Sequence, residues 1–218
     1  MKSFLRNILG RSGKFSSAKY WDKRYSSAGN SGAGSYGRLA EFKASVLNAY
    51  VADHGIARVL ELGCGDGNQL SLANYENYVG LDISPTAVEI CTDRFKSNKH
   101  WRFDVISSVD LRALERTFDP QFVMSIDVLF HLVEDEIFHD YMTNLFQFGS
   151  ATIAIYSSNG NFNVSAPHIR NHTFTDWIAA NAPEWELLEK VDNPYPWSEE
   201  APDATSFCDF YFFRKGTT

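Results

Sequence analysis

The chain has 218 residues, of which 44% are hydrophobic, and its formal net charge is −7. These values predict one folded domain with a full core and exclude a disordered chain. No apolar stretch reaches the roughly 18 residues that a membrane span needs, and we expect no secretory signal in the short, charged start. The three cysteines, Cys64, Cys91 and Cys208, are odd in number and widely spaced. They predict reduced thiols in a cytoplasmic protein rather than a disulfide framework or a zinc site.

Charge is distributed unevenly along the chain. Residues 1–24 contain seven Lys or Arg and one Asp, a net charge of +6, so the remaining chain carries −13. An acidic body argues against nucleic acid as a partner. The basic start also contains Phe4, Leu5 and Ile8. We expect a mobile, solvated arm there. The alternative is a weak helix that binds a partner or lies on the inner membrane face without stable insertion.

The predicted elements alternate between helices and strands. Residues 26–35 are rich in Ser, Gly and Ala and predict a loop or lid, and residues 37–53 have the spacing of an amphipathic helix. Strands follow at about 58–62, 77–82, 100–105, 121–126 and 151–156, with helices after the first glycine-rich turn, from Ser84 to about Ser97, and at about 134–147 and 174–181. Two late strands lie near 185–191 and 207–213. This order predicts an α/β fold with a doubly wound sheet and a late antiparallel hairpin.

A glycine-rich turn follows the first predicted strand. Residues 59–67 read Val-Leu-Glu-Leu-Gly-Cys-Gly-Asp-Gly, which lets the chain turn tightly and lets a ligand approach the backbone. The second predicted strand ends at Asp82, about 20 residues further on, where a carboxylate suits ribose hydroxyls. Together these features predict a nucleoside-containing cofactor at the carboxyl edge of a parallel sheet.

The glycine spacing indicates which cofactor this is. A dinucleotide fold has the pattern G-x-G-x-x-G, whereas here the third glycine comes one position early, at Gly67. Glu61, two residues before the first glycine, would repel a pyrophosphate but suits a cationic, amine-bearing ligand. These residues favour S-adenosylmethionine, which carries a sulfonium and an α-amino group, and they disfavour a dehydrogenase.

At this point the sequence resembles the class I S-adenosylmethionine-dependent methyltransferases. Residues 61–67 look like the first motif of that family, and Gly80-Leu81-Asp82 looks like the second. The resemblance implies a Rossmann-like sheet of seven strands with an antiparallel last strand. It also implies a basic N-terminal arm and lid over residues 1–35 and a methyltransferase domain over residues 36–218. Residues 18–215 look similar to small bacterial enzymes, some encoded beside surface-polysaccharide glycosyltransferases.

The resemblance also implies a set of cofactor contacts. Residues 20–25, Tyr-Trp-Asp-Lys-Arg-Tyr, look like a lid segment, although a hydrophobic staple for the first helix is an alternative. Arg38 would pair with the methionine carboxylate, and Asp104 would hold the adenine amino group unless it only caps the next segment. The full expected set is Tyr20, Tyr36, Arg38, Glu61, Gly63, Cys64, Gly65, Asn68, Asp82, Ile83, Phe103, Asp104, Val105 and Asp127.

Asp127 and His131 are the candidate catalytic residues. They follow the fourth predicted strand, whose carboxyl end lies over the transferred methyl group in this fold, and they are four residues apart. His131 is the candidate general base and Asp127 its orienting group or a cofactor contact, while a packing role for His131 is the alternative. No metal is expected, although Glu134 and Asp135 would complete a magnesium site with these two residues.

Three side chains after the fifth predicted strand are candidates for the acceptor. His168, Arg170 and His172 face the same way in an extended chain and suit a phosphate or carboxylate, whereas a solvated loop is the alternative. We therefore expect methyl transfer to a hydroxyl of a sugar, glycan or other small polar acceptor. The alternative is a cofactor- or partner-binding homologue without transfer activity. Base-amine methylation is disfavoured, because residues 126–130 lack the Asp-Pro-Pro-Tyr type of sequence. The oligomeric state stays open.

Overall fold

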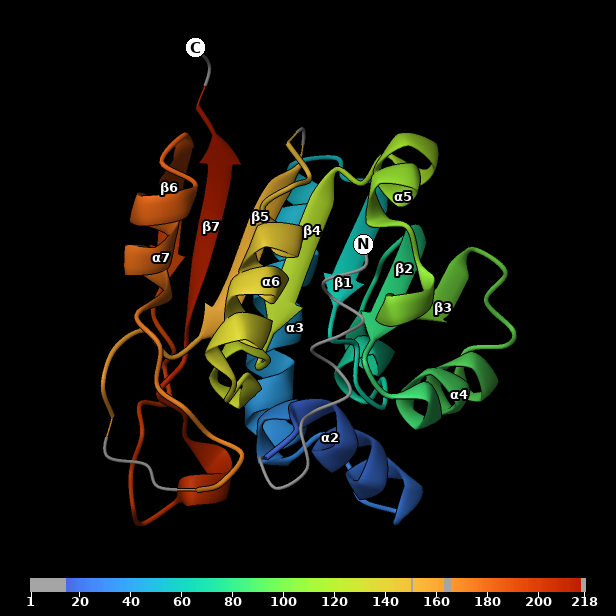
Figure 1. The fold of residues 1–218 in the computed structure, drawn as a ribbon. Helices are drawn as coiled ribbons and strands as arrows, with labels where there is room; N and C mark the ends of the chain where they lie inside the picture. The colour runs from blue at the N-terminus through green and yellow to red at the C-terminus, as the bar shows by residue number, and fades with distance from the viewer. Residues whose placement is uncertain (1–14, 150, 163–165, 217–218) are drawn as a thin grey trace.

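The computed structural model describes residues 15–149, 151–162 and 166–216. Its core is a seven-stranded sheet with the order β3-β2-β1-β4-β5-β7-β6 (Figure 1). The strands are β1 (Arg58–Leu62), β2 (Asn77–Asp82), β3 (Trp101–Val105), β4 (Phe122–Ile126), β5 (Thr152–Ser157), β6 (Trp185–Val191) and β7 (Asp209–Lys215). The first five strands pair in parallel, and β7 is antiparallel to both β5 and β6. The predicted α/β fold, its antiparallel last strand and the late hairpin are confirmed.

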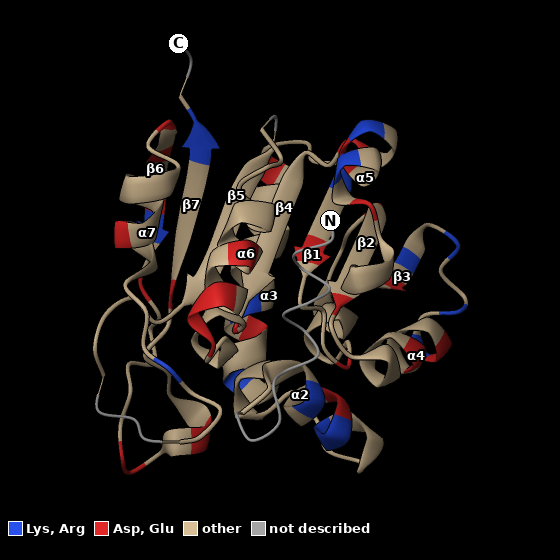
Figure 2. Cartoon of the chain, in the orientation of Figure 1, with Lys and Arg blue, Asp and Glu red and all other residues tan. Residues whose placement is uncertain are grey.

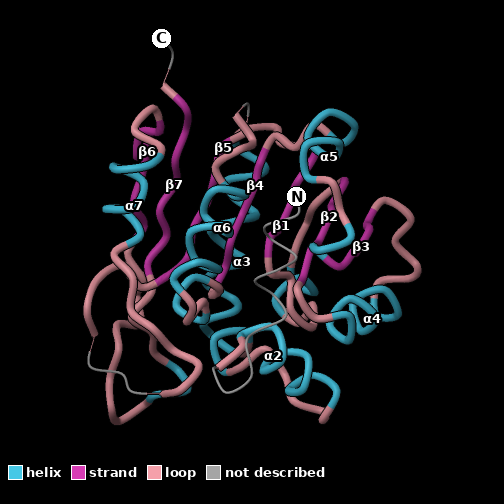
Figure 3. Tube along the Cα trace, in the orientation of Figure 1, coloured by secondary structure: helices cyan, strands magenta, loops and turns pink. Residues whose placement is uncertain are grey.

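Helices cover both faces of the sheet and one of its edges. They are α2 (Ser17–Ser26), α3 (Gly37–Asp53), α4 (Pro85–Arg94), α5 (Leu111–Phe118), α6 (Asp135–Leu145) and α7 (Phe174–Asn181). Helices α5, α6 and α7 pack on one face, and α3 and α4 pack on the other (Figures 1 and 3). Helix α2 lies across the carboxyl ends of the parallel strands (Figure 1). The carboxyl edge is therefore the part of the sheet where the chain encloses a site.

Successive side chains of the strands alternate between the two faces of the sheet, and each face has its own hydrophobic core. Leu60 and Leu62 of β1 belong to the cluster that includes Met142 of α6, whereas Val59 belongs to the cluster that includes Leu47 of α3. Successive side chains of a strand point to opposite faces, so a strand that is apolar throughout is buried on both. The central strands carry few charged residues, and most charges lie on helices, loops and strand ends (Figure 2).

The structure differs from the predicted elements in four places. The helix that begins after Ser84 ends at Arg94 rather than near Ser97, and only a 3₁₀ turn, η2 (Gln69–Leu72), follows the glycine loop. Helices α2 and α5 were not expected. Both begin at a capping residue: the side chain of Ser16 accepts from the Lys19 amide, and that of Asp110 accepts from two amides of α5.

The predictions for the basic arm fall mostly on residues 1–14, which lie outside the described part of the chain. Within residues 15–149, 151–162 and 166–216, no helix is long and apolar enough to cross a membrane.

Candidate active site

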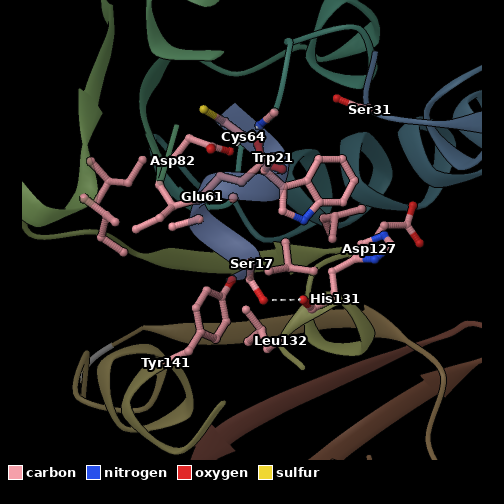
Figure 4. Close-up of a pocket in the computed structure, with 18 of the residues that line it drawn as sticks. Ser17, Trp21, Ser31, Glu61, Cys64, Asp82, Asp127, His131, Leu132 and Tyr141 are labelled. Carbon is pink, nitrogen blue, oxygen red and sulfur yellow. Dashed lines mark hydrogen bonds between the residues drawn. The ribbon is translucent and has the colours of Figure 1, made fainter. Parts of the chain in front are cut away.

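A cavity of about 1140 Å³, which includes space open to solvent, lies at the carboxyl edge of the sheet. Its walls come from the ends of β1, β2 and β4, from the start of α6 and from α2. Figure 4 shows Glu61 and Asp82 on one side of this cavity, and Asp127 and His131 on the other, next to Trp21. The cavity therefore brings together side chains that follow three different strands.

The glycine loop after β1 needs its glycines. The amides of Gly63 and Cys64 both donate to the carbonyl oxygen of Leu81, at 2.6 and 3.2 Å, which holds the turn against β2. Gly63 has φ +92°, and a Cβ there would lie 2.4 Å from a methyl group of Val128. Gly65 has φ +57°, and a Cβ there would lie 2.5 Å from Ser31 Oγ. Both positions exclude other residues by conformation and by space.

Two buried carboxylates flank this loop. Asp82 accepts hydrogen bonds from the amides of Gly65 and Ser84, each at 2.9 Å, and its burial raises its pKa above the ordinary value. Glu61 accepts from the hydroxyl of Tyr78 at 2.5 Å, and burial raises the pKa of Glu61 to about 7. A cavity with these acceptors repels a pyrophosphate and suits a ligand with hydroxyl donors and a cationic group.

Lys43 and Asp127 form a buried ion pair beside the cavity. The exposed fractions of their side chains are 1% and 18%, and Lys43 Nζ also lies 5.3 Å from the centre of the Tyr156 ring. Lys43 was not among the candidate residues. It lies four residues from both Leu39 and Leu47, on the buried side of α3. A lysine within a buried helical stripe is unusual unless it is paired, and this spacing is the signal that could have identified it.

His131 is held as a neutral imidazole. It ends the 3₁₀ turn η4 (Leu129–His131), and its Nδ1 lies 3.0 Å from the carbonyl oxygen of His168. Since a carbonyl only accepts, Nδ1 carries the proton and Nε2 keeps its lone pair. Burial lowers the pKa of His131 to about 4, and the Trp21 ring meets its ring edge-on at 4.7 Å. The ring is therefore unprotonated at neutral pH but is weakly basic.

Helix α2 is fastened on both sides of the cavity. At its start, the Ser17 amide donates to Glu134 at 3.0 Å, and Ser17 Oγ lies 3.1 Å from the carbonyl oxygen of His131 (Figure 4). Further along α2, Asp22 accepts from Ser84 Oγ at 2.6 Å and from the Thr86 amide at 3.2 Å. These contacts join α2 to the segments after β4 and after β2, so α2 covers one side of the cavity.

Comparison with known proteins identifies the central part of the chain. Residues 59–148, which contain the glycine loop and both carboxylates, match the profile of a family described as a methyltransferase domain. Residues 59–148 are a methyltransferase domain. The sheet of the described chain, with the order β3-β2-β1-β4-β5-β7-β6 and an antiparallel β7, has the fold of solved S-adenosylmethionine-dependent methyltransferases. The expected family and cofactor are thereby confirmed.

Similar proteins include methyltransferases with different printed names. EEF1A lysine methyltransferase 4 of Mus musculus is 29% identical over 106 residues, which are 47% of this chain and 39% of that protein. The match thus spans about two fifths of the length of that relative. The structure of N-methyltransferase NodS from Bradyrhizobium japonicum with S-adenosyl-L-homocysteine is 16% identical, with a TM-score of 0.58 over 82% of this chain and 88% of that one. Small RNA methyltransferase HEN1 is 16% identical, with a TM-score of 0.59 over 84% of this chain and 26% of that one. At these identities the two structures show a shared fold.

The cavity brings together only part of the expected cofactor set. The residues of this set that line the cavity are Glu61, Gly63, Cys64, Gly65, Asp82, Ile83 and Asp127, and the candidate base His131 lines it as well. Those that do not line it are Tyr20, Tyr36, Arg38, Asn68, Phe103, Asp104 and Val105. Asn68 instead donates to the Ser35 carbonyl oxygen at 2.7 Å, Asp104 pairs with Arg102 at 2.7 Å, and the Phe103 ring stacks on Phe95 at 5.7 Å.

The three candidate acceptor residues do not meet in one site of the protein. The Tyr20 ring stacks on His168 at 4.9 Å. Arg170 pairs with Asp135 at 2.6 Å. His172 lies 2.8 Å from the Leu132 carbonyl oxygen through Nε2 and stacks on the Phe138 ring at 3.8 Å. Each of the three side chains is thus engaged with a different partner.

The acidic residues near His131 also have other partners. Glu134 accepts from Ser17, and Asp135 pairs with Arg170. Among the described residues, no group of three or more His, Cys, Asp or Glu side chains is arranged to hold a metal ion. Independence from a metal remains a prediction.

Proposed function

We propose that the protein transfers the methyl group of S-adenosylmethionine to a hydroxyl of a sugar, glycan or other small polar acceptor. The observation that carries this proposal is the cavity under α2, with two buried carboxylates beside a glycine loop and a neutral histidine on the opposite side. In this proposal residues 1–35 act as arm and lid, and residues 36–218 form the methyltransferase domain. The contacts of Ser17 and Asp22 across the cavity support the role of the lid.

The hydrogen-bond acceptors and the apolar side chains of the cavity fit this cofactor. Glu61 suits its ammonium group, and Asp82 suits the ribose hydroxyls, while Ile83, Ile106 and Leu132 provide apolar surface for the adenine. When bound, the cofactor supplies an electrophilic methyl group on a sulfonium. Because that methyl group needs no further activation, alignment of the acceptor is the main task of the protein.

His131 is the residue that we assign to the acceptor hydroxyl. Its Nε2 is free to accept the hydroxyl proton, because Nδ1 is bonded to the His168 carbonyl oxygen. Asp127 contributes a negative charge that favours the protonated ring. Trp21 and the rest of α2 exclude water from the imidazole. The low pKa of His131 makes it an effective hydrogen-bond acceptor in the ground state and a modest base.

The acceptor class rests on the sequence of this chain, because the names of the similar proteins differ. They include a lysine methyltransferase, a small RNA methyltransferase and the N-methyltransferase NodS. The net charge of −7 disfavours RNA as a substrate, and residues 126–130 lack the Asp-Pro-Pro-Tyr type of sequence. Both observations favour a hydroxyl on a small polar molecule, and the resemblance noted above suggests surface polysaccharide as its context. The three buried, unpaired cysteines of the described residues support a reducing, cytoplasmic location.

A cofactor-binding homologue without transfer activity is the second candidate. The observation that favours it is the pKa of His131, about 4, which lies far below the value near neutrality that suits a general base.

The first test is calorimetric titration of S-adenosylmethionine and S-adenosylhomocysteine into the wild type and Asp82→Ala. We expect micromolar binding that is lost in the variant, and unchanged binding in the control Asp93→Ala, whose side chain is 81% exposed. If neither ligand binds the folded wild type, the proposed function is rejected. Binding combined with no methyl transfer to any of a panel of sugars, sugar phosphates and amines would favour the second candidate.

A further inference from the structure

The cavity contains a single cationic side chain. Lys43 is the one Lys or Arg among the described residues that line it, and its side chain is 1% exposed. Burying an ammonium group is costly unless the charge is paired, and an apolar side chain of similar size would pack in α3 at lower cost. The charge of Lys43 therefore requires an explanation beyond packing.

Arg38, which the family resemblance implies as the partner of the methionine carboxylate, is engaged elsewhere. Its Nε donates to the carbonyl oxygen of Ala204 at 2.6 Å, and its guanidinium lies 4.3 Å from the centre of the Tyr195 ring. It lines a second hollow, together with Tyr36 and Asp203, rather than the cavity under α2.

The surroundings of Lys43 match the charges of an amino acid. Glu61 lies close enough for the positive charge of Lys43 to lower its pKa against the effect of burial. Gln69 also lines the cavity, and its buried Oε1 has no hydrogen-bond partner among the described residues. One cation and two acceptors complement a carboxylate and an ammonium group on the same carbon atom.

We propose that Lys43 binds the carboxylate of the amino-acid tail of S-adenosylmethionine, and that this carboxylate replaces Asp127 at Lys43. Glu61 and Gln69 Oε1 receive the ammonium group of the same tail. Asp127 is then a placeholder that keeps Lys43 paired in the unliganded protein and is released toward His131 when the tail binds. This inference rests on the proposed function and names the residue that positions its cofactor.

The test compares two ligands that differ only in the tail. S-adenosylhomocysteine carries the amino-acid tail, whereas 5′-methylthioadenosine has the nucleoside and thioether without it. Calorimetry with Lys43→Met should show S-adenosylhomocysteine binding weakened by about tenfold to a hundredfold, as expected for a hydrogen bond between charged groups. Binding of 5′-methylthioadenosine should change by less than about twofold. Lys43→Arg, which keeps the charge, should recover most of the affinity for S-adenosylhomocysteine.

Lys43→Met leaves Asp127 buried without its partner, so the double variant Lys43→Met/Asp127→Asn is measured in parallel. Thermal unfolding establishes that both are folded, and Lys96→Met, with a side chain that is 74% exposed, is the matched control. Equal losses for both ligands would mean that Lys43 only supports the fold of the cavity, and the inference would be wrong. Arg38→Met is measured as well. If Arg38→Met weakens S-adenosylhomocysteine binding and Lys43→Met does not, Arg38 binds the carboxylate and the inference is wrong. If the wild type binds neither ligand, the proposed function fails first and the inference with it.

Discussion

Replacing Glu61 with glutamine should stabilise the unliganded protein at pH 8 and leave its stability at pH 4 almost unchanged. Burial raises the pKa of Glu61 from 4.5 to about 7 in the folded protein. Below pH 4.5 the carboxyl group is protonated in both the folded and the unfolded state. Between pH 4.5 and 7 the unfolded chain ionises first, so the wild type loses stability as the pH rises, and above pH 7 the loss is complete.

The size of this effect follows from the two pKa values. A rise from 4.5 to about 7 corresponds, at about 1.4 kcal/mol per pH unit, to about 3 kcal/mol of unfolding free energy. Glutamine has almost the same shape as glutamate and keeps an oxygen that can accept from the Tyr78 hydroxyl. The substitution therefore removes the ionisation without opening a cavity.

Urea unfolding of wild type and Glu61→Gln, measured in steps from pH 4 to pH 8, tests this reasoning. The quantity to follow is the difference in unfolding free energy between the two proteins at each pH, because other titrating groups cancel in it. The difference should grow by about 3 kcal/mol in favour of the variant between pH 4.5 and 7. A difference that stays constant across this range would refute the argument.

His131→Gln provides the opposite control. Burial lowers the pKa of His131 from 6.5 to about 4, so the unfolded chain takes up the proton first as the pH falls. The wild type then loses stability between pH 6.5 and 4, and this loss should be absent from the variant. The advantage of His131→Gln should therefore grow toward low pH, whereas that of Glu61→Gln should grow toward high pH.

Three further substitutions test the lid, the loop and the support of the cavity. Asp22→Ala removes the acceptor of the Ser84 hydroxyl and should make tryptic cleavage within α2 several-fold faster, so an unchanged rate would count against a docked lid. Gly65→Ala forces a φ of +57° on alanine and brings its Cβ to 2.5 Å from Ser31 Oγ. Urea unfolding should show a cost of about 1 to 3 kcal/mol, and calorimetry should show no S-adenosylhomocysteine binding; normal affinity would contradict this. Tyr141→Phe leaves the last carbonyl oxygen of β1, now bonded at 2.6 Å, without a partner. It should cost about 1 to 2 kcal/mol in urea unfolding, and a change near zero would mean that water replaces the hydroxyl.

The strands and the acidic residues at their ends were predictable because their signals are local. Alternation, glycine and short apolar runs identify each strand, and parallel strands end at one edge of the sheet. Glu61, Asp82 and Asp127 therefore meet once the strand order is known. The position of each of these residues depends on its own segment and on the sheet.

Lys43 and Arg38 were not predictable in this way, because their roles depend on distant contacts. The spacing of residues 37–53 predicts only an amphipathic helix, whereas the structure buries Lys43 on the same side of that helix as Leu39 and Leu47. Arg38 is held by Ala204, which is 166 residues away in the sequence. No local pattern near Arg38 indicates that contact.

Helix α2 also affects how fast a ligand exchanges. It is joined to the segment after β2 and to the segment after β4, so a ligand that fills the space beneath it enters or leaves only when one of these attachments opens. We therefore expect the observed association rate in stopped-flow mixing to level off at high S-adenosylhomocysteine concentration, at the opening rate of α2. A rate that rises linearly without limit would mean that α2 closes only after binding. If the rate does level off, the same slow opening of α2 would limit product release and therefore the turnover rate.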